Sequence, residues 1–297
     1  MLLALMLCLL QDPPALADWS SQRTDLSAAT VSVRQQWLAA CLKAGDDPAL
    51  RAAALEIYAQ IGGRAHLRPV LEWLAEDPTA QARTAVHSIC ARDPEGVETL
   101  LAIASHSVAL RPQACVLAVE LGGPASTAEP RAEAHLISML AEPESQLCGE
   151  LLLLSGHWQV QAAVPRLVEL MDAESSGLRR DAHWSLRQIT GLGLQPRAED
   201  WRVWFDREQQ WWHERLSPTL AALDADDPLV QQRGLRELGE RHWRRAELRP
   251  ALEQFLTRAD EPRARQAEAL LLRWEESQRK KVPDSRPARR VRPRCHS

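Results

Sequence analysis

A twelve-residue frame recurs along this 297-residue chain and constrains the fold more than any other feature of the sequence. It reads apolar-Arg-x-x-Ala-x-x-x-apolar-x-x-Ile at 50–61 and again at 178–189. A third copy starts at Val230, with Gln for the Arg and Gly for the Ala, and looser copies follow 77–78 and 260. Positions 0, 4, 8 and 11 of the frame share one side of a helix, so each copy predicts a helix with one apolar face. The small residue at the fourth position would let a neighbouring helix approach closely.

A second frame, Pro-x-Leu-x-x-apolar, occurs at 69–74, 165–170 and 250–255. Pro suits a helix start because the first N–H groups have no helical acceptor, and the Asp-Pro pairs ahead of the first frame would supply caps. The two helix types alternate about every 30 residues, which is typical of a solenoid of helical pairs. Leu and Ala dominate the 45% apolar content and no alternating strand is visible, so the sequence predicts an all-α fold.

With these two frames the chain resembles HEAT repeats, particularly the short HEAT-like repeats of phycobilisome lyases, over roughly residues 30–276. The resemblance implies five to seven repeats in a right-handed α-solenoid of about 12–15 helices. It also implies that an Arg such as Arg51 or Arg179 pairs with an Asp of a neighbouring inter-helix turn. The candidates are Asp47, Asp77, Asp172 and Asp227. Between 105 and 160 the copies lack the Asp-Pro and the Arg, so the repeat register stays open there.

The N-terminus differs from the repeat region, which we place at 18–277. Leu2 to Leu10 is a short apolar run, and Ala15-Leu16-Ala17 forms a small-x-small site. Residues 1–17 therefore predict a signal peptide and export to the periplasm or cell envelope. No Lys or Arg precedes the run, which leaves a buried first helix in a cytoplasmic protein as the alternative. No segment is long and apolar enough to span a bilayer.

Residues 278–297 form a basic tail that is punctuated by Pro. Eight Lys/Arg and one Asp give the tail +7, which leaves −11 for the rest of a chain whose net charge is −4. Three interpretations stay open: a disordered end, an anion binder, or a segment that folds back on the acidic body. As an anion binder, the tail would hold an anionic polymer with Arg289, Arg290 and Arg292. The acidic body argues against nucleic acid as a partner, because DNA binding requires phosphate neutralisation.

Four of the eleven Trp lie within 201–212, together with Phe205. At 100° per residue these five rings fall within an arc of about 120°, which predicts a strongly amphipathic helix near 198–216. The aromatic face is either packed core or partly an open groove for a peptide or glycan, in which Trp201 and Trp204 would contact the ligand. The run "SLRQITG" followed by "WRVWF" resembles an element of exported bacterial HEAT-repeat proteins, to which no chemistry is attached.

The sequence contains no recognisable catalytic or metal-binding motif. The nine His are scattered, and HExxH, GxSxG and a Gly-rich phosphate loop are absent. There is no CxxC among the six Cys, and those inside the repeat region fit as small core hydrophobes, at Cys41, Cys90, Cys115 and Cys148. We therefore predict no catalytic residue, no cofactor and no metal site.

The function that fits these observations is a non-enzymatic scaffold that binds another, unidentified protein through the concave face of the solenoid. One alternative is an enzyme or enzyme subunit on a HEAT scaffold, either lyase-like or similar to DNA glycosylases, with Trp201, Asp200 and Arg202 lining a groove. Another is an anionic-polymer binder that works through the tail. Fold alone does not choose among them.

Overall fold

The computed structural model describes residues 26–41, 47–122 and 130–279, and over these ranges the chain is all-α, without strands. It forms fifteen α-helices, labelled α3 to α17, which confirms the predicted fold class and helix number. The handedness of the solenoid stays a prediction. The described residues divide after Trp158 into two compact units, unit 1 up to Trp158 and unit 2 from Gln159. No described helix is long and apolar enough to cross a membrane.

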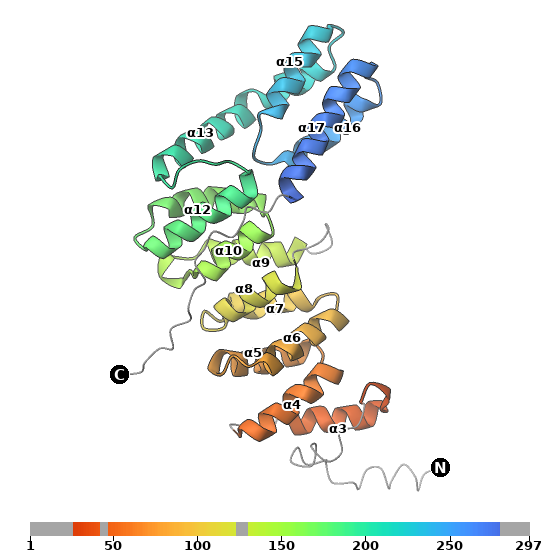
Figure 1. Ribbon diagram of the computed structural model, residues 1–297, viewed down its shortest axis with the longest axis vertical. Coiled ribbons are helices and arrows are strands. Elements are labelled where there is room, and N and C mark those ends of the chain that lie inside the picture. The colour runs from red at the N-terminus through yellow and green to blue at the C-terminus, as the bar shows by residue number, and fades with distance from the viewer. Residues whose placement is uncertain (1–25, 42–46, 123–129, 280–297) are drawn as a thin grey trace. The chain divides into compact units, whose positions relative to one another are not determined.

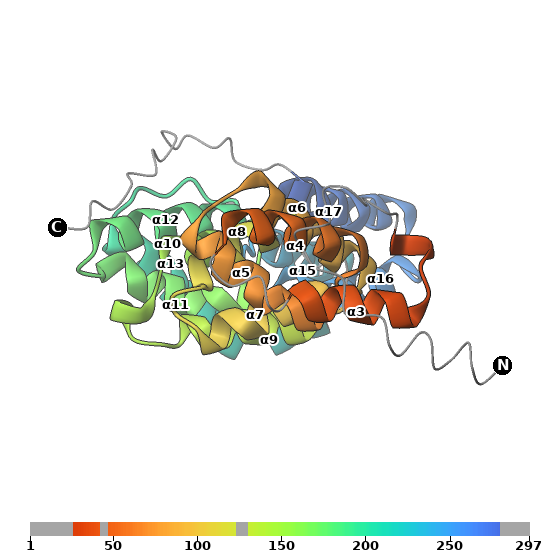
Figure 2. The same cartoon turned by 90° about the horizontal axis from the view of Figure 1, so that it is seen from below.

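Unit 1 is a stack of four helical pairs in two layers (Figure 1). Helices α3, α5, α7 and α9 each pack on the helix that follows them, and α4, α6, α8 and α10 pack on one another in sequence. The end-on view separates α4, α6 and α8 from α3, α7 and α9 (Figure 2). The bounds are α3 Val31–Cys41, α4 Pro48–Ile61, α5 Leu67–Glu76, α6 Ala80–Arg92, α7 Gly96–His106, α8 Arg111–Leu121, α9 Pro130–Leu140 and α10 Gly149–His157.

Unit 2 contains three more helical pairs and one additional long helix. The pairs are α11 with α12, α14 with α15 and α16 with α17, and α13 stands between the first two in the sequence. The bounds are α11 Val164–Glu169, α12 Ser176–Thr190, α13 Ala198–Glu214, α14 Leu216–Leu223, α15 Pro228–Gly239, α16 Arg245–Leu256 and α17 Glu261–Arg279. The Trp-rich helix expected near 198–216 is therefore α13, an insertion in the repeat pattern.

The residues of the first frame act as the sequence predicts. Ala54 and Ala182 are buried, and Gly234 lies so close to α14 that a Cβ would meet the Thr219 carbonyl oxygen at 3.2 Å. Asp47 caps α4 by accepting from the N–H groups of Ala49 and Leu50. The Ala or Gly at the fourth position of the frame thus permits close helix packing, as expected.

Two details of the helix starts were predicted wrongly. Asp77 does not cap α6, because Thr79 intervenes and its hydroxyl accepts from the N–H of Ala82 at 3.2 Å. Pro250 does not start its helix: α16 begins at Arg245, so Pro250 lies inside it, beyond the first turn. In both cases the sequence after the proline was read correctly as helix, but the boundary was set by a neighbouring residue.

Ion pairs connect successive elements of unit 1 at about the repeat spacing. Their partners are 25 to 37 residues apart in the sequence. They are Arg51–Glu76 at 2.7 Å, Arg83–Glu120 at 2.6 Å and Arg111–Glu142 at 2.7 Å. Each ion pair joins one helical pair to the next, so the ion pairs reinforce the order in which the helical pairs stack.

The Arg–Asp pairing that the resemblance implied for Arg179 is wrong. The guanidinium of Arg179 donates instead to the carbonyl oxygens of Ala173 and Glu174, at 2.6 and 2.9 Å. Asp172 lies 3.4 Å from Arg202 of α13. The turn before α12 thus presents backbone acceptors to Arg179, and the Asp172 carboxylate pairs with Arg202 of the inserted helix instead.

Candidate functional site

Helix α13 buries one stripe of its aromatic face and leaves another part half-exposed. Trp201 is 0% exposed, and Phe205 and Trp211 are buried, whereas Trp204 and Trp212 are half-buried. Trp201 packs edge-on against Trp204, with ring centroids 5.6 Å apart. The core interpretation therefore describes most of this face, and Trp212 is the ring that remains open to a cavity.

A buried carboxylate lies in the middle of this aromatic face. Glu208 is only 4% exposed, and an oxygen of its carboxylate lies 3.5 Å from Nη1 of Arg241. Burial raises the pKa of Glu208, and the Arg241 charge opposes that shift. Sequence reasoning missed Glu208, although the signal was present: seven residues after Trp201 is the same side of a helix.

Three charged or titratable residues from the chain that follows α15 lie near Glu208, and they are Arg241, His242 and Arg245. His242 Nδ1 lies 3.1 Å from the Thr190 carbonyl oxygen and 2.8 Å from Nη2 of Arg245. Burial lowers the pKa of His242, and the two nearby guanidinium groups lower it further. Burial also lowers the pKa of Arg245, to about 10. The pKa values of Glu208, His242 and Arg245 are shifted, but the Glu208 carboxylate is closed to solvent.

The segment 240–244 carries these residues because it reaches back across unit 2. The indole N–H of Trp243 donates to the Gln161 carbonyl oxygen at 3.0 Å, and the N–H of Arg244 donates to the side-chain oxygen of Gln161 at 3.0 Å. Arg244 has φ 54°, a left-handed conformation that is uncommon for a residue other than Gly. The strained residue turns the chain into α16 and points the Arg244 side chain at Trp212.

The first surface site is the Trp212 cavity, about 560 Å³ in volume. The Arg244 guanidinium carbon lies 4.4 Å from the centroid of the Trp212 ring, which is within the range of a cation–π contact. Trp243 packs edge-on against Trp212 at 6.4 Å. The rest of the lining comes from α13: Asp206, Gln209, Gln210, His213 and Glu214. The cavity therefore combines a fixed aromatic ring and a fixed guanidinium with hydrogen-bonding side chains.

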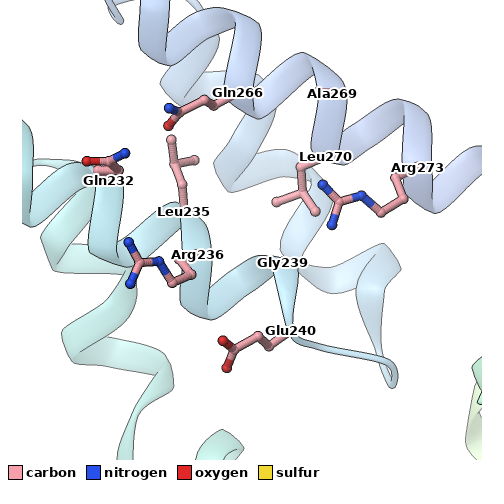
Figure 3. A pocket seen from close by; sticks show the side chains of 9 residues that line it. All are labelled: Gln232, Leu235, Arg236, Gly239, Glu240, Gln266, Ala269, Leu270 and Arg273. Atoms are coloured by element: carbon pink, nitrogen blue, oxygen red, sulfur yellow. The ribbon is translucent and has the colours of Figure 1, made fainter.

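The second surface site is the α15–α17 groove, about 370 Å³ in volume (Figure 3). Leu235 and Leu270 point into the space between the two helices, and Gly239 leaves room beneath Leu270 (Figure 3). The polar lining comes from both walls: Gln232, Arg236 and Glu240 on the α15 side, and Gln266 and Arg273 on α17. The groove therefore has an apolar floor and a charged rim.

The described residues contain no group of three His, Cys, Asp or Glu side chains that could hold a metal ion. His87 Nε2 lies 3.1 Å from Glu120. Cys115 and Cys148 are hydrogen-bonded to one another, and this bond lowers the pKa of the Cys148 thiol. Cys148 is not in a helix as expected, but precedes α10 as its N-cap and is half-buried.

The predicted site residues have different outcomes. Trp201 is core, so it does not line an open groove in this structure, and with it the proposed trio of Trp201, Asp200 and Arg202 loses its aromatic member. A binding role for half-buried Trp204 stays a prediction. Arg289, Arg290 and Arg292 lie outside the described residues, as does the signal peptide at 1–17.

The chain matches no protein-family model and no curated protein. Among solved structures it is similar to a designed armadillo repeat protein in complex with peptide (KR)4, at 18% identity and a TM-score of 0.22, over 81% of this chain and 99% of the other. The assignment of a helical repeat fold rests on the helices and contacts described above.

Proposed function

We propose that this chain is a non-enzymatic HEAT-type repeat protein that binds another protein, and that the Trp212 cavity holds an extended segment of that partner. The observation that supports the proposal is the cavity of about 560 Å³ beside a half-buried Trp. This volume is in the range of ligand pockets. Tryptophan and arginine are the residues that contribute most to protein interfaces, and here Arg244 is already stacked on Trp212.

The lining of the Trp212 cavity suits a peptide. Gln209 and Gln210 can both donate to and accept from a backbone, and His213 adds a further polar group. The backbone that carries these side chains is already helical, so binding has to order the side chains but not the backbone. The sequence prediction placed the partner on the concave face of the solenoid, whereas the present proposal places it at the inserted helix α13.

The perturbed titratable groups favour a non-enzymatic role over an enzymatic one. A general acid or base has to come within hydrogen-bonding distance of its substrate. Glu208 is 4% exposed, and neither it nor His242 lines the Trp212 cavity. Their perturbation follows from burial in the core of unit 2, which is the structural cause of many such shifts.

Site-specific photo-crosslinking tests the proposal. A photo-reactive residue at Gln209 lies in the Trp212 cavity, whereas one at Arg207 is also exposed on α13 but outside the lining. With the full chain in native cell extract, we expect a protein adduct from position 209 and little from position 207. Trp212→Ala should reduce the 209 adduct by about tenfold, the loss expected for a moderate interface contact.

Three outcomes would contradict the proposal. Equal adducts from positions 207 and 209 would indicate surface collision, and no adduct from 209 would mean that the cavity holds no protein. An adduct that survives Trp212→Ala in a variant with unchanged circular dichroism would remove the aromatic ring from the interface.

We also propose that the protein is exported, because residues 1–17 have the composition of a signal peptide. Sequencing of the mature N-terminus should begin at Asp18, and a mature chain beginning at Met1 would contradict export. The tail is tested by comparing 18–297 with 18–277. Partners that require 278–297 and are lost as salt rises would assign binding to the tail instead of to the repeats.

A further inference from the structure

The α15–α17 groove carries two cationic side chains that are not neutralised. The guanidinium groups of Arg236 and Arg273 form no hydrogen bond or ion pair with any residue that the structure describes. They come from opposite walls, Arg236 from α15 and Arg273 from α17 (Figure 3). Two unpaired guanidinium groups in the lining of one groove offer ten N–H donors of the kind that match carboxylates bidentately.

The surroundings of the groove increase its positive potential. Arg245 is buried nearby, and the charge of Arg273 contributes to the lowering of its pKa, after burial itself. Glu240, the carboxylate in the lining, already lies 3.7 Å from Arg241. The Arg241 charge therefore partly offsets that of Glu240. The groove keeps an excess of positive charge on an otherwise acidic body.

We propose that the α15–α17 groove binds an acidic peptide segment, with Asp or Glu carboxylates on Arg236 and Arg273 and apolar side chains on Leu235 and Leu270. This site is separate from the Trp212 cavity and does not depend on the function proposed for that cavity. The charge complementarity selects an anionic ligand, and the floor of two leucines selects one with apolar groups between its charges.

The same lining disfavours a uniformly anionic polymer such as nucleic acid. A chain that carries a charge at every unit would also place one beside Glu240, whose charge is only partly offset by Arg241. Gln232 and Gln266 instead offer paired donors and acceptors, which suit the amide groups of a peptide backbone. A polynucleotide also gains its affinity from many phosphate contacts, and this groove supplies two free cations.

Fluorescence anisotropy with the full chain tests the proposal. The probe is a fluorescein-labelled peptide in which Glu alternates with Leu and Gly, and the control probe has Lys for Glu. We expect the acidic probe to bind and the Lys probe not to bind. The double variant Arg236→Gln/Arg273→Gln should weaken binding by about tenfold or more, because both charge-assisted contacts are lost.

A matched control separates the groove from the general charge of unit 2. Arg233→Gln/Arg265→Gln removes two positive charges from the same two helices, but neither residue lines the groove. This variant should change affinity by no more than about twofold.

A second variant tests occupancy without changing charge. A Cβ at Gly239 would stand 3.6 Å from Leu270 Cδ1, an ordinary contact, so a side chain can start there without a backbone clash. Gly239→Leu is chosen to fill the groove, and unchanged circular dichroism checks that the variant folds. Gly239→Leu should abolish probe binding, while Trp212→Ala should leave it unchanged.

The proposal is overturned if the acidic probe does not bind the full chain, or if both double variants weaken it equally. It is also overturned if Gly239→Leu still binds the probe, or if a labelled single-stranded oligonucleotide binds more tightly and loses affinity in Arg236→Gln/Arg273→Gln. Sensitivity of the probe to Trp212→Ala would transfer the acidic peptide to the Trp212 cavity. The other results do not bear on the photo-crosslinking at position 209, so failure of the groove proposal leaves the proposal for the Trp212 cavity standing.

Discussion

Arg111 is a buried charge that connects three elements of unit 1. Its side chain is 1% exposed. Both Nη atoms donate to the Glu142 carboxylate, at 2.7 and 3.0 Å, and Nη1 also donates to the Gln146 carbonyl oxygen at 2.7 Å. Nε donates to the Ala104 carbonyl oxygen at 3.3 Å. One side chain thus joins the end of α7, the start of α8 and the turn between α9 and α10.

Arg111→Met keeps most of the side-chain volume and removes the guanidinium. The Glu142 carboxylate, which is 25% exposed, then loses its counter-charge, and two carbonyl oxygens lose a donor. Breaking a buried pair by removing one partner costs about 3–5 kcal/mol. We expect the free energy of unfolding to fall by about that amount, because water can reach only part of the carboxylate.

Urea denaturation followed by circular dichroism measures the loss, and hydrogen exchange on peptides from α8 to α10 assigns it to this region. Arg83→Met is the matched control, since Arg83 of α6 pairs with Glu120 of α8 but both side chains are more exposed, at 46% and 33%. The control should cost no more than about 1 kcal/mol. If Arg111→Met costs no more than Arg83→Met, burial does not determine the strength of these inter-repeat pairs and the reasoning is refuted.

Three further predictions concern single residues. Trp201→Ala should destabilise by about 3–5 kcal/mol in urea titrations and half-buried Trp204→Ala by less, about 1–3 kcal/mol; equal losses would contradict the burial order. Since the pKa of His242 is lowered from 6.5, the unfolded state takes up the proton first as pH falls. The wild type should therefore lose stability relative to His242→Gln below pH 6.5, and parallel pH curves would contradict this. Cys148, whose pKa is lowered, should react with iodoacetamide before Cys41, whose pKa burial raises to about 12, and site mapping by mass spectrometry would show the reverse order if this is wrong.

Most of the helices could be predicted from the local periodicity of apolar residues. The frame at 178–189 lies inside α12, and the aromatic arc predicted a helix near 198–216 where α13 spans Ala198–Glu214. These predictions succeeded because a helix face depends only on residues three and four positions apart. Helix boundaries depend on a single competing side chain, and so Thr79 displaced the cap expected at Asp77.

The site was harder to predict because it depends on contacts between distant segments. The aromatic arc of α13 did not show which rings would be covered, and Trp201 and Trp212 have different exposures for that reason. Glu208 was within reach of the same argument, but carboxylates on helices are normally solvated, and composition gave no reason to place one in the core. The α15–α17 groove depends on two helices being neighbours, which a repeat predicts without specifying the residues between them.

The segment 240–244 makes unit 2 differ from a simple repeat array. In a solenoid each repeat contacts mainly its neighbours, and the named ion pairs of unit 1 span 25 to 37 residues. In unit 2, Trp243 and Arg244 bond to Gln161 across 82 and 83 residues, and His242 reaches Thr190 across 52. These hydrogen bonds join the segment 240–244 to Gln161, which precedes α11, and to Thr190 at the end of α12. Local opening at either place therefore has to break bonds to a segment that is distant in the sequence. Unit 2 should therefore unfold as one cooperative body, and the rigid placement of Trp212 beside Arg244 is a consequence of the same hydrogen bonds.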